Sequence, residues 1–132
     1  MNLDVPYGIT RRLAATTLAD ARARVTESLK AEGFGVLTEI DVQATLKKKL
    51  DVDVAPYVIL GACNPTLAHR ALTKEPGVGL LLPCNVVVAQ DGADALISAL
   101  NPRAMFAAVQ GADLADVAED AEARLRRAVA NA

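Results

Sequence analysis

The chain has 132 residues, 52% of them hydrophobic, and its 14 basic and 16 acidic side chains give a formal net charge of −2. We expect a single domain over residues 1–132, because this length builds one core and is too short for two ordinary domains. The charge balance and the few aromatic residues exclude the basic face and stacking platform of nucleic-acid binders. No apolar run reaches the roughly 20 residues of a membrane span, and the first residues lack a signal-peptide pattern. We therefore expect a cytoplasmic location, with neither nucleic acid nor membrane as a partner.

The first third of the chain predicts two strands with a helix between them. Residues 9–14 can form a short opening strand. Thr17 is a typical N-cap for a helix over 18–32, whose apolar residues share one face. Gly33 suits the left-handed position that follows a helix, and a second strand is predicted over 34–40.

A second helix is predicted directly after this strand. Asp41 stands at its N-cap position, and apolar residues form a stripe along 42–50. Three lysines at 47–49 crowd the last turn, where cations complement the helix dipole. They fit a solvated helix end, or a contact with a phosphate or an acidic ligand.

The middle of the chain predicts a buried strand that runs straight into a third helix. Residues 57–62 are nearly all apolar, as in a central strand with little solvent on either face. Cys63 follows this strand. Asn64 is a good N-cap and Pro65 a good first helical residue, so a helix over 65–74 is predicted.

The remaining residues predict strands followed by a long helix. Residues 79–82 and 86–89 look like strand, interrupted by Pro83-Cys84-Asn85, and a turn leads back into a return strand over 95–100. Asn101-Pro102 opens a shorter helix. Asp113 is placed as the cap of the long final helix. Together these elements predict an α+β fold of two layers, with helices packed against a mostly antiparallel sheet.

Two cysteines mark the place where chemistry is expected. Cys63 and Cys84 are both followed by asparagine, and both stand beside a break in regular structure that a proline imposes. Cys63 precedes a helix N-terminus, where unpaired N–H groups favour a thiolate. If their strands pair, both thiols could face one cleft. The alternative is that both cysteines are small buried hydrophobic residues.

Other candidate groups carry weaker signals. His69 could join the cysteines as a third metal ligand, but its neighbours equally suit a surface histidine. Asp41 is a helix cap rather than a general base. The sequence contains no phosphate-binding loop, zinc-protease or nucleophile-elbow pattern, so we name no metal ligands and assign no reaction or cofactor.

Three motifs resemble one family throughout the chain. Gly33-Phe34-Gly35-Val36-Leu37-Thr38-Glu39-Ile40-Asp41, Tyr57-Val58-Ile59-Leu60-Gly61-Ala62-Cys63-Asn64-Pro65 and Leu81-Leu82-Pro83-Cys84-Asn85-Val86 are similar to domain-of-unknown-function family 302. The resemblance implies a TATA-box-binding-protein-like arrangement and a homodimer, without DNA binding. It marks Glu39, Asp41, Lys47, Cys63, Asn64, Pro65, Pro83, Cys84 and Asn85 as motif positions. Asp51 departs from the family pattern, where glycine is expected after a helix.

Two hypotheses follow for function. In the first, Cys63 and Cys84 line a small pocket in a homodimer, and Asn64 and Asn85 help to bind a sulfur species, a metal or another small ligand. Glu39, Asp41 and Lys47 complete the candidate binding residues. In the second, the protein is a non-catalytic module with structural cysteines that binds a protein partner or an apolar ligand.

Overall fold

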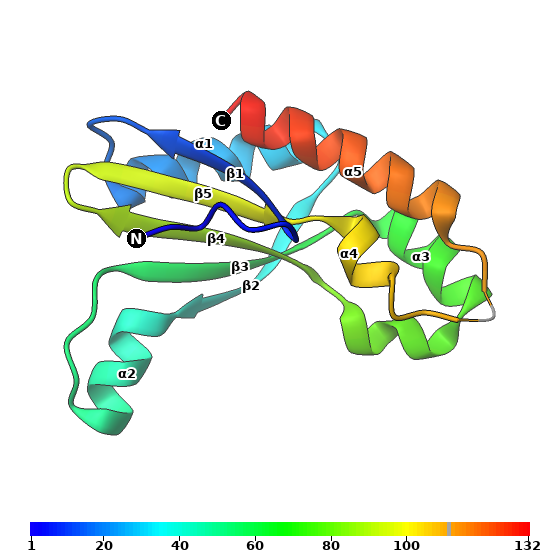
Figure 1. Ribbon diagram of the computed structural model, residues 1–132, viewed down its shortest axis with the longest axis horizontal. Helices are drawn as coiled ribbons and strands as arrows, with labels where there is room; N and C mark the ends of the chain where they lie inside the picture. Colours follow the sequence, from blue (N-terminus) through cyan, green and yellow to red (C-terminus); the bar gives the residue numbers. More distant parts are fainter. Residues whose placement is uncertain (111) are drawn as a thin grey trace.

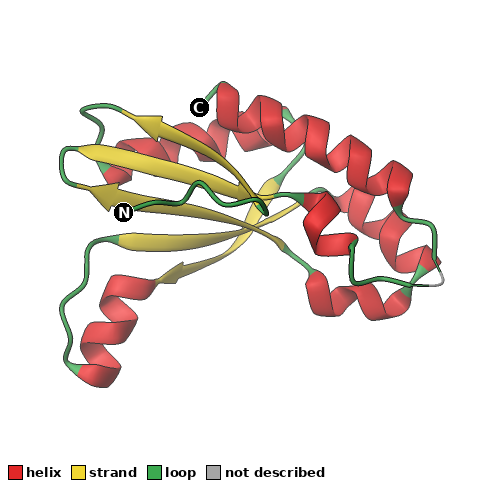
Figure 2. Cartoon of the chain, viewed as in Figure 1, coloured by secondary structure: helices red, strands yellow, loops and turns green. Residues whose placement is uncertain are grey.

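The structure is a computed structural model that describes residues 1–110 and 112–132. Strands and helices alternate through most of the chain (Figures 1 and 2). In chain order the elements are β1 (Gly8–Leu13), α1 (Leu18–Ala31), β2 (Gly35–Asp41), α2 (Val42–Leu50), β3 (Tyr57–Cys63), α3 (Pro65–Lys74), the 3₁₀ helix η1 (Pro76–Leu81), β4 (Cys84–Asp91), β5 (Asp94–Leu100), α4 (Pro102–Phe106) and α5 (Ala115–Ala130).

The strands form one sheet in the order β1-β5-β4-β3-β2, and each neighbouring pair is antiparallel. The predicted α+β class with an antiparallel sheet is therefore confirmed, whereas the likeness to the TATA-box-binding protein stays a prediction. No helix in the part of the chain that the structure describes is long and apolar enough to cross a membrane.

Helices α1 and α5 cover one face of this sheet (Figure 2). Alternate strand residues point toward them, so Leu60, Val86 and Ile97 are almost completely buried. Two arginines fix the end of α5: Arg11 donates hydrogen bonds to the carbonyls of Val129 and Ala130 in its last turn, and both Arg11 and Arg24 donate to the oxygen of Ala132 just beyond it. These cations satisfy acceptors that a helix C-terminus leaves unpaired and complement its dipole.

At the outer end of the edge strand β2, helix α2 projects away from the packed body (Figure 1), and we call the β2–α2 segment (residues 35–50) the arm. β2 is an edge strand, and every one of its side chains except Val36 is exposed. α2 buries none of its residues. The amphipathic stripe predicted along 42–50 thus forms a helix whose apolar face is left largely open.

Local capping signals place most helix ends as predicted. The side chains of Thr17, Asp41 and Asn64 each accept a hydrogen bond from a backbone N–H in the first turn of α1, α2 and α3. Gly33 has the expected left-handed backbone, with φ of +85°. Asp51, which stands where glycine is expected, also adopts a left-handed conformation at φ +52° and caps α2.

Two predicted elements were wrong in part. Residues 79–82 are not a strand: most of them belong to η1, where Pro76 fixes the first φ and the Glu75 carboxylate accepts from the Gly77 N–H at 3.1 Å. Asp113 is not the cap residue of α5, which begins at Ala115 after Leu114. Asp113 lies one position before the cap residue, and its carboxylate still accepts a hydrogen bond from the Ala115 N–H at 3.0 Å.

Candidate functional site

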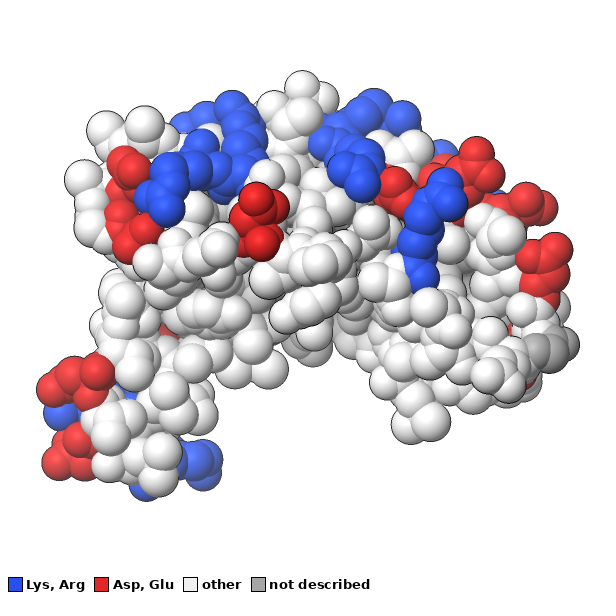
Figure 3. Space-filling view, viewed as in Figure 1, with Lys and Arg blue, Asp and Glu red and all other residues white. Residues whose placement is uncertain are grey.

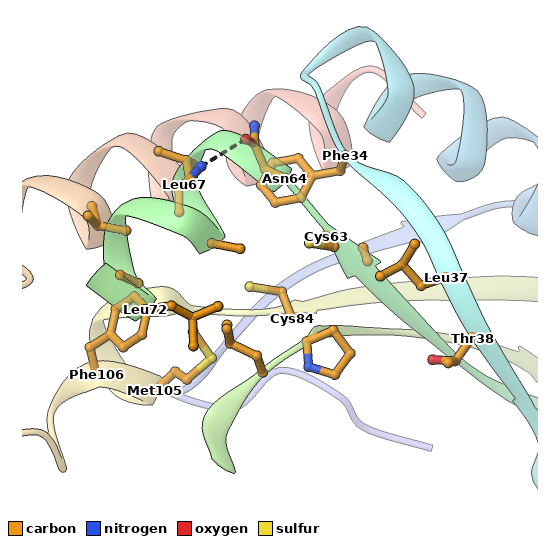
Figure 4. A pocket seen from close by; sticks show the side chains of 17 residues that line it. Phe34, Leu37, Thr38, Cys63, Asn64, Leu67, Leu72, Cys84, Met105 and Phe106 are labelled. Atoms are coloured by element: carbon orange, nitrogen blue, oxygen red, sulfur yellow. Dashed lines mark hydrogen bonds between the residues drawn. The ribbon is translucent and has the colours of Figure 1, made fainter. Parts of the chain in front are cut away.

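A cavity of about 310 Å³ opens where the ends of β3 and β4 meet the helices α3, α4 and α5 (Figure 4). Its wall is made almost entirely of apolar side chains, and none of the 17 described residues that line it carries a charge. They are Phe34, Leu37, Thr38, Ala62, Cys63, Asn64, Leu67, Ala68, Ala71, Leu72, Leu82, Pro83, Cys84, Met105, Phe106, Val117 and Ala121.

Strand pairing brings both cysteines to this cavity. β3 lies antiparallel to β4, with Ala62 opposite Cys84, and Cys63 is the next residue along β3. Figure 4 shows both side chains between Leu37 at one end of the cavity and Met105 at the other. The condition set by the sequence, that the two strands pair, is met, and both thiols line the same pocket.

The two thiols differ in their surroundings. Cys63 is half-buried, whereas Cys84 is only 8% exposed. Burial raises the pKa of the Cys84 thiol to about 11, and repulsion from Cys63 adds to the increase. Cys84 is therefore a neutral thiol at neutral pH, because desolvation disfavours the charged form.

Asn64 is part of the wall but its amide is already committed. Its side-chain oxygen accepts from the Leu67 N–H at 3.1 Å, and its nitrogen donates to the carbonyl of Glu32 at 3.5 Å. The side chain is 8% exposed. Asn64 thus caps α3 and ties it to the end of α1, which holds the cavity wall in place.

A β-bulge shapes the exposed end of the cavity. Val36 pairs with Ala62 and Thr38 with Gly61, so Leu37 is an extra residue in β2. Leu37 is 69% exposed and still lines the cavity, which makes it part of the mouth. The Thr38 side chain lies over Gly61, where an added Cβ would collide with it.

The other predicted site residues lie away from this cavity. Asn85 follows Cys84 in the strand, so its side chain points to the opposite face. It lines a separate cavity of about 280 Å³ with Tyr7 and Tyr57. The prediction grouped Asn85 with Cys84, and the alternation of the strand separates them.

The three charged candidate residues lie on the β2–α2 arm. Glu39 forms an ion pair with Arg22 of α1. Asp41 caps α2 by accepting from the Ala44 N–H at 2.9 Å. Lys47 lies 3.0 Å from the Asp51 carboxylate and also pairs with Asp53. None of the three is among the residues that line the cavity.

A metal site of the usual kind is not found in residues 1–110 and 112–132. No group of three or more histidine, cysteine, aspartate and glutamate side chains comes together there. His69 is exposed on α3 and does not line the cavity.

Sequence reasoning missed the apolar part of the wall. Leu72, Met105 and Phe106 come from α3 and α4, far along the chain from β2. Their only signal was apolar spacing within short helices, which does not tell which distant elements meet.

Comparisons with known proteins agree with this architecture. The family described as "Domain of unknown function DUF302" matches residues 9–132. A crystal structure of an uncharacterized conserved DUF302 protein from Bacillus stearothermophilus is similar over 96% of this chain and 98% of that chain, with 34% identity and a TM-score of 0.87. No curated protein matches. With its fold, its motifs and a family match that spans nearly all of its length, the chain belongs to the DUF302 family.

Proposed function

We propose that this protein binds a neutral, apolar small molecule in the cavity between β3, β4 and α3, with Cys63 and Cys84 facing the ligand. The observation that carries the proposal is a cavity of about 310 Å³ whose described lining residues are all uncharged. Cavities of about this volume hold small ligands in other proteins. We also propose a cytoplasmic location, because free thiols stay reduced there.

The wall chemistry selects the ligand class. An ionised ligand would lose its hydration in this cavity without gaining a charged partner, which is unfavourable. An apolar ligand gains from covering Leu67, Met105 and Phe106. Phosphates, carboxylates and charged thiols such as glutathione are therefore poor candidates, and the lysines at 47–49 lie on the arm rather than in the wall.

A cavity-filling variant tests this proposal. The environment-sensitive dye Nile red is titrated into the protein, and its fluorescence reports binding. Ala68→Leu extends a half-buried wall residue of α3 into the cavity and is expected to weaken dye binding at least about tenfold, since the added atoms occupy ligand volume. Ala44→Leu adds the same atoms on the exposed surface of α2 and is expected to leave binding unchanged. Absent dye binding, or equal binding by both variants, would refute the proposal.

We further propose that a second copy of this chain pairs with the arm to form a homodimer. β2 is an unpaired edge strand, and such edges are templates for another strand. Of the large hydrophobic residues that are exposed, five fall between residues 37 and 54: Leu37, Ile40, Leu50, Val52 and Val54. In Figure 3 the surface between the arm and the lobe around η1 is largely uncharged. Antiparallel pairing of β2 with β2 is self-complementary, as a two-fold interface requires.

Solution mass measurements test the dimer. Light scattering coupled to size-exclusion chromatography is expected to give twice the chain mass. Ile40→Asp, on the 50% exposed arm residue, is expected to give monomer because a carboxylate would be buried in the interface. Leu80→Asp changes a residue of η1 that is 92% exposed and is expected to leave the dimer intact. A monomeric wild type, or a dimeric Ile40→Asp variant, would contradict the proposal.

A further inference from the structure

The groups that can react with a ligand in this cavity are few. The Asn64 amide is committed to capping α3, and no charged side chain is among the described residues of the wall. The two thiols form no hydrogen bond to any residue in 1–110 or 112–132. Besides the hydroxyl of Thr38, a weak nucleophile, the two thiols are therefore the reactive groups of this wall, and a thiolate is a soft nucleophile.

We propose that Cys63 captures an apolar α,β-unsaturated ketone or aldehyde in this cavity and forms a thioether with it. The inference rests on the proposed function, because it names the chemical class of the apolar ligand. The cavity supplies binding for the apolar tail. Cys63 supplies the bond.

The position of Cys63 favours it over Cys84 as the nucleophile. Cys63 is half-buried at the end of β3, so this residue is more accessible to an incoming ligand than Cys84 is. Cys84 is buried and neutral, with the raised pKa already described. In Figure 4 both side chains lie partway along the cavity, with Leu37 and Thr38 toward one end and Met105 and Phe106 toward the other. A ligand whose tail lies against Met105 and Phe106 would have its reactive end beside Cys63.

The step is a conjugate addition that needs no oxidant or reductant. A lone pair of the Cys63 thiolate forms a bond from Sγ to the β-carbon of the ligand. The π electrons of the carbon–carbon double bond move to the carbonyl group and give an enolate. The enolate then takes a proton from water at its α-carbon. Overall one thiol and one unsaturated carbonyl compound become one thioether, and every atom is retained.

Holding the two reactants together should accelerate this step. Binding replaces a bimolecular encounter with a reaction inside one complex, and such positioning can contribute large factors. We expect a straight-chain nonenone to add to Cys63 at least about tenfold faster than to glutathione at the same pH. A small hydrophilic electrophile, iodoacetamide, gains no such advantage because it has no apolar tail to bind.

The experiment uses the full chain and a matched pair of ligands, nonenone and nonanone, which differ only in the double bond. Intact-mass spectrometry follows the adduct, peptide mapping locates it, and displacement of Nile red measures binding of the saturated ketone. One adduct per chain on Cys63 is expected. Cys63→Ser should abolish the adduct, wild type should bind nonanone without any mass change, and peptide mapping of wild type should find no adduct on Cys84. Ala68→Leu keeps Cys63 but fills the cavity, and should slow addition to the glutathione rate.

The outcomes separate this inference from the proposed function. If nonanone binds but nonenone reacts no faster than with glutathione, or reacts at Cys84, the inference is overturned and the apolar site stands. If addition remains fast in Ala68→Leu, the cavity does not direct the reaction and the inference is likewise overturned. If Nile red and nonanone both fail to bind, the proposed function and the inference fall together.

Discussion

Helices α5 and α2 each carry an apolar stripe, but only α5 buries its stripe within this chain. α5 lies on the sheet beside α1, and its apolar face is buried, with Leu125 completely enclosed. α2 sits on the arm and buries no residue, so that Leu50 at its end is 67% exposed. An amphipathic pattern therefore predicts that a helix has a face to bury, but not that the same chain buries it. On the arm, that face is available to a second copy of the chain.

The largest effect is expected from truncating one leucine in each helix. Leu125→Ala should lower the free energy of unfolding by about 2–5 kcal/mol, because it leaves a cavity in the core. Leu50→Ala should change it by less than about 0.5 kcal/mol. Urea unfolding at low protein concentration, where association does not contribute, measures both. Similar losses in the two variants would show that α2 is packed as tightly as α5.

The alkylation rate of Cys84 should also show whether this cysteine lies in packed or in open structure. At a pKa of about 11, the Cys84 thiolate is scarce at neutral pH, so native Cys84 should be alkylated at least about a hundredfold more slowly than in the unfolded chain. Its rate should rise about tenfold per pH unit between about pH 7 and about pH 9, still below its pKa. Mass spectrometry of each cysteine peptide after iodoacetamide treatment gives the rates. Equal native and unfolded rates would place Cys84 in open structure.

A smaller effect is expected from two strand glycines. Gly61→Ala puts a Cβ against the Thr38 side chain and 2.9 Å from Cγ of Pro83, so it should destabilise the protein by about 1–3 kcal/mol. Gly35→Ala places its Cβ where no atom lies within 4 Å and should change stability by less than about 0.5 kcal/mol. Thermal unfolding compares the two. Addition of Thr38→Ala should recover part of the Gly61→Ala loss, and no recovery would contradict the contact.

The smallest effect is expected on the surface of α5. Arg126 and Arg103 donate hydrogen bonds to Glu122 and lower the pKa of its carboxyl group. A lowered pKa stabilises the folded state above the ordinary glutamate pKa of about 4.3, and this contribution is lost as the pH falls through the lower folded value. Glu122→Gln should therefore cost less than about 1 kcal/mol at neutral pH.

The pH dependence of that variant supplies its check. The difference in unfolding free energy between wild type and Glu122→Gln should shrink as the pH falls below about 4. Only wild type has a carboxyl group at position 122 that becomes protonated there. Glu119→Gln, an exposed carboxylate on the same helix, should show a smaller difference at every pH. A difference that grows in acid would contradict the lowered pKa.

Helix starts were predictable because their causes are local. Thr17, Asp41 and Asn64 lie within three residues of the N–H groups that they accept from, so the sequence holds both partners. The apolar run Gly79–Leu82 was misread because short runs have no diagnostic period. Glu75 and Pro76, which precede this run, start the 3₁₀ helix η1 there instead.

Among the predicted binding residues, Asn64 lines the cavity and so do the two cysteines. Their position beside chain breaks drew attention, and both do line the cavity. Asn85 was grouped with Cys84 because sequence neighbours were treated together, whereas a strand sends them to opposite faces. The far wall, including Met105 and Phe106, depends on how α4 packs against α5, which no local pattern specifies.

The bulge in β2 has a consequence for how this site can evolve. Val36 and Thr38 face consecutive residues of β3, so strand pairing on either side does not depend on Leu37. We therefore expect deletion or replacement of that one residue to keep Glu39 beside Arg22 and Ile40 opposite Ile59. The mouth of the cavity is thus built by a residue that the sheet does not need. If the cavity binds the proposed ligand, substitution at this position would change which ligands enter while the rest of β2 stays under constraint for folding.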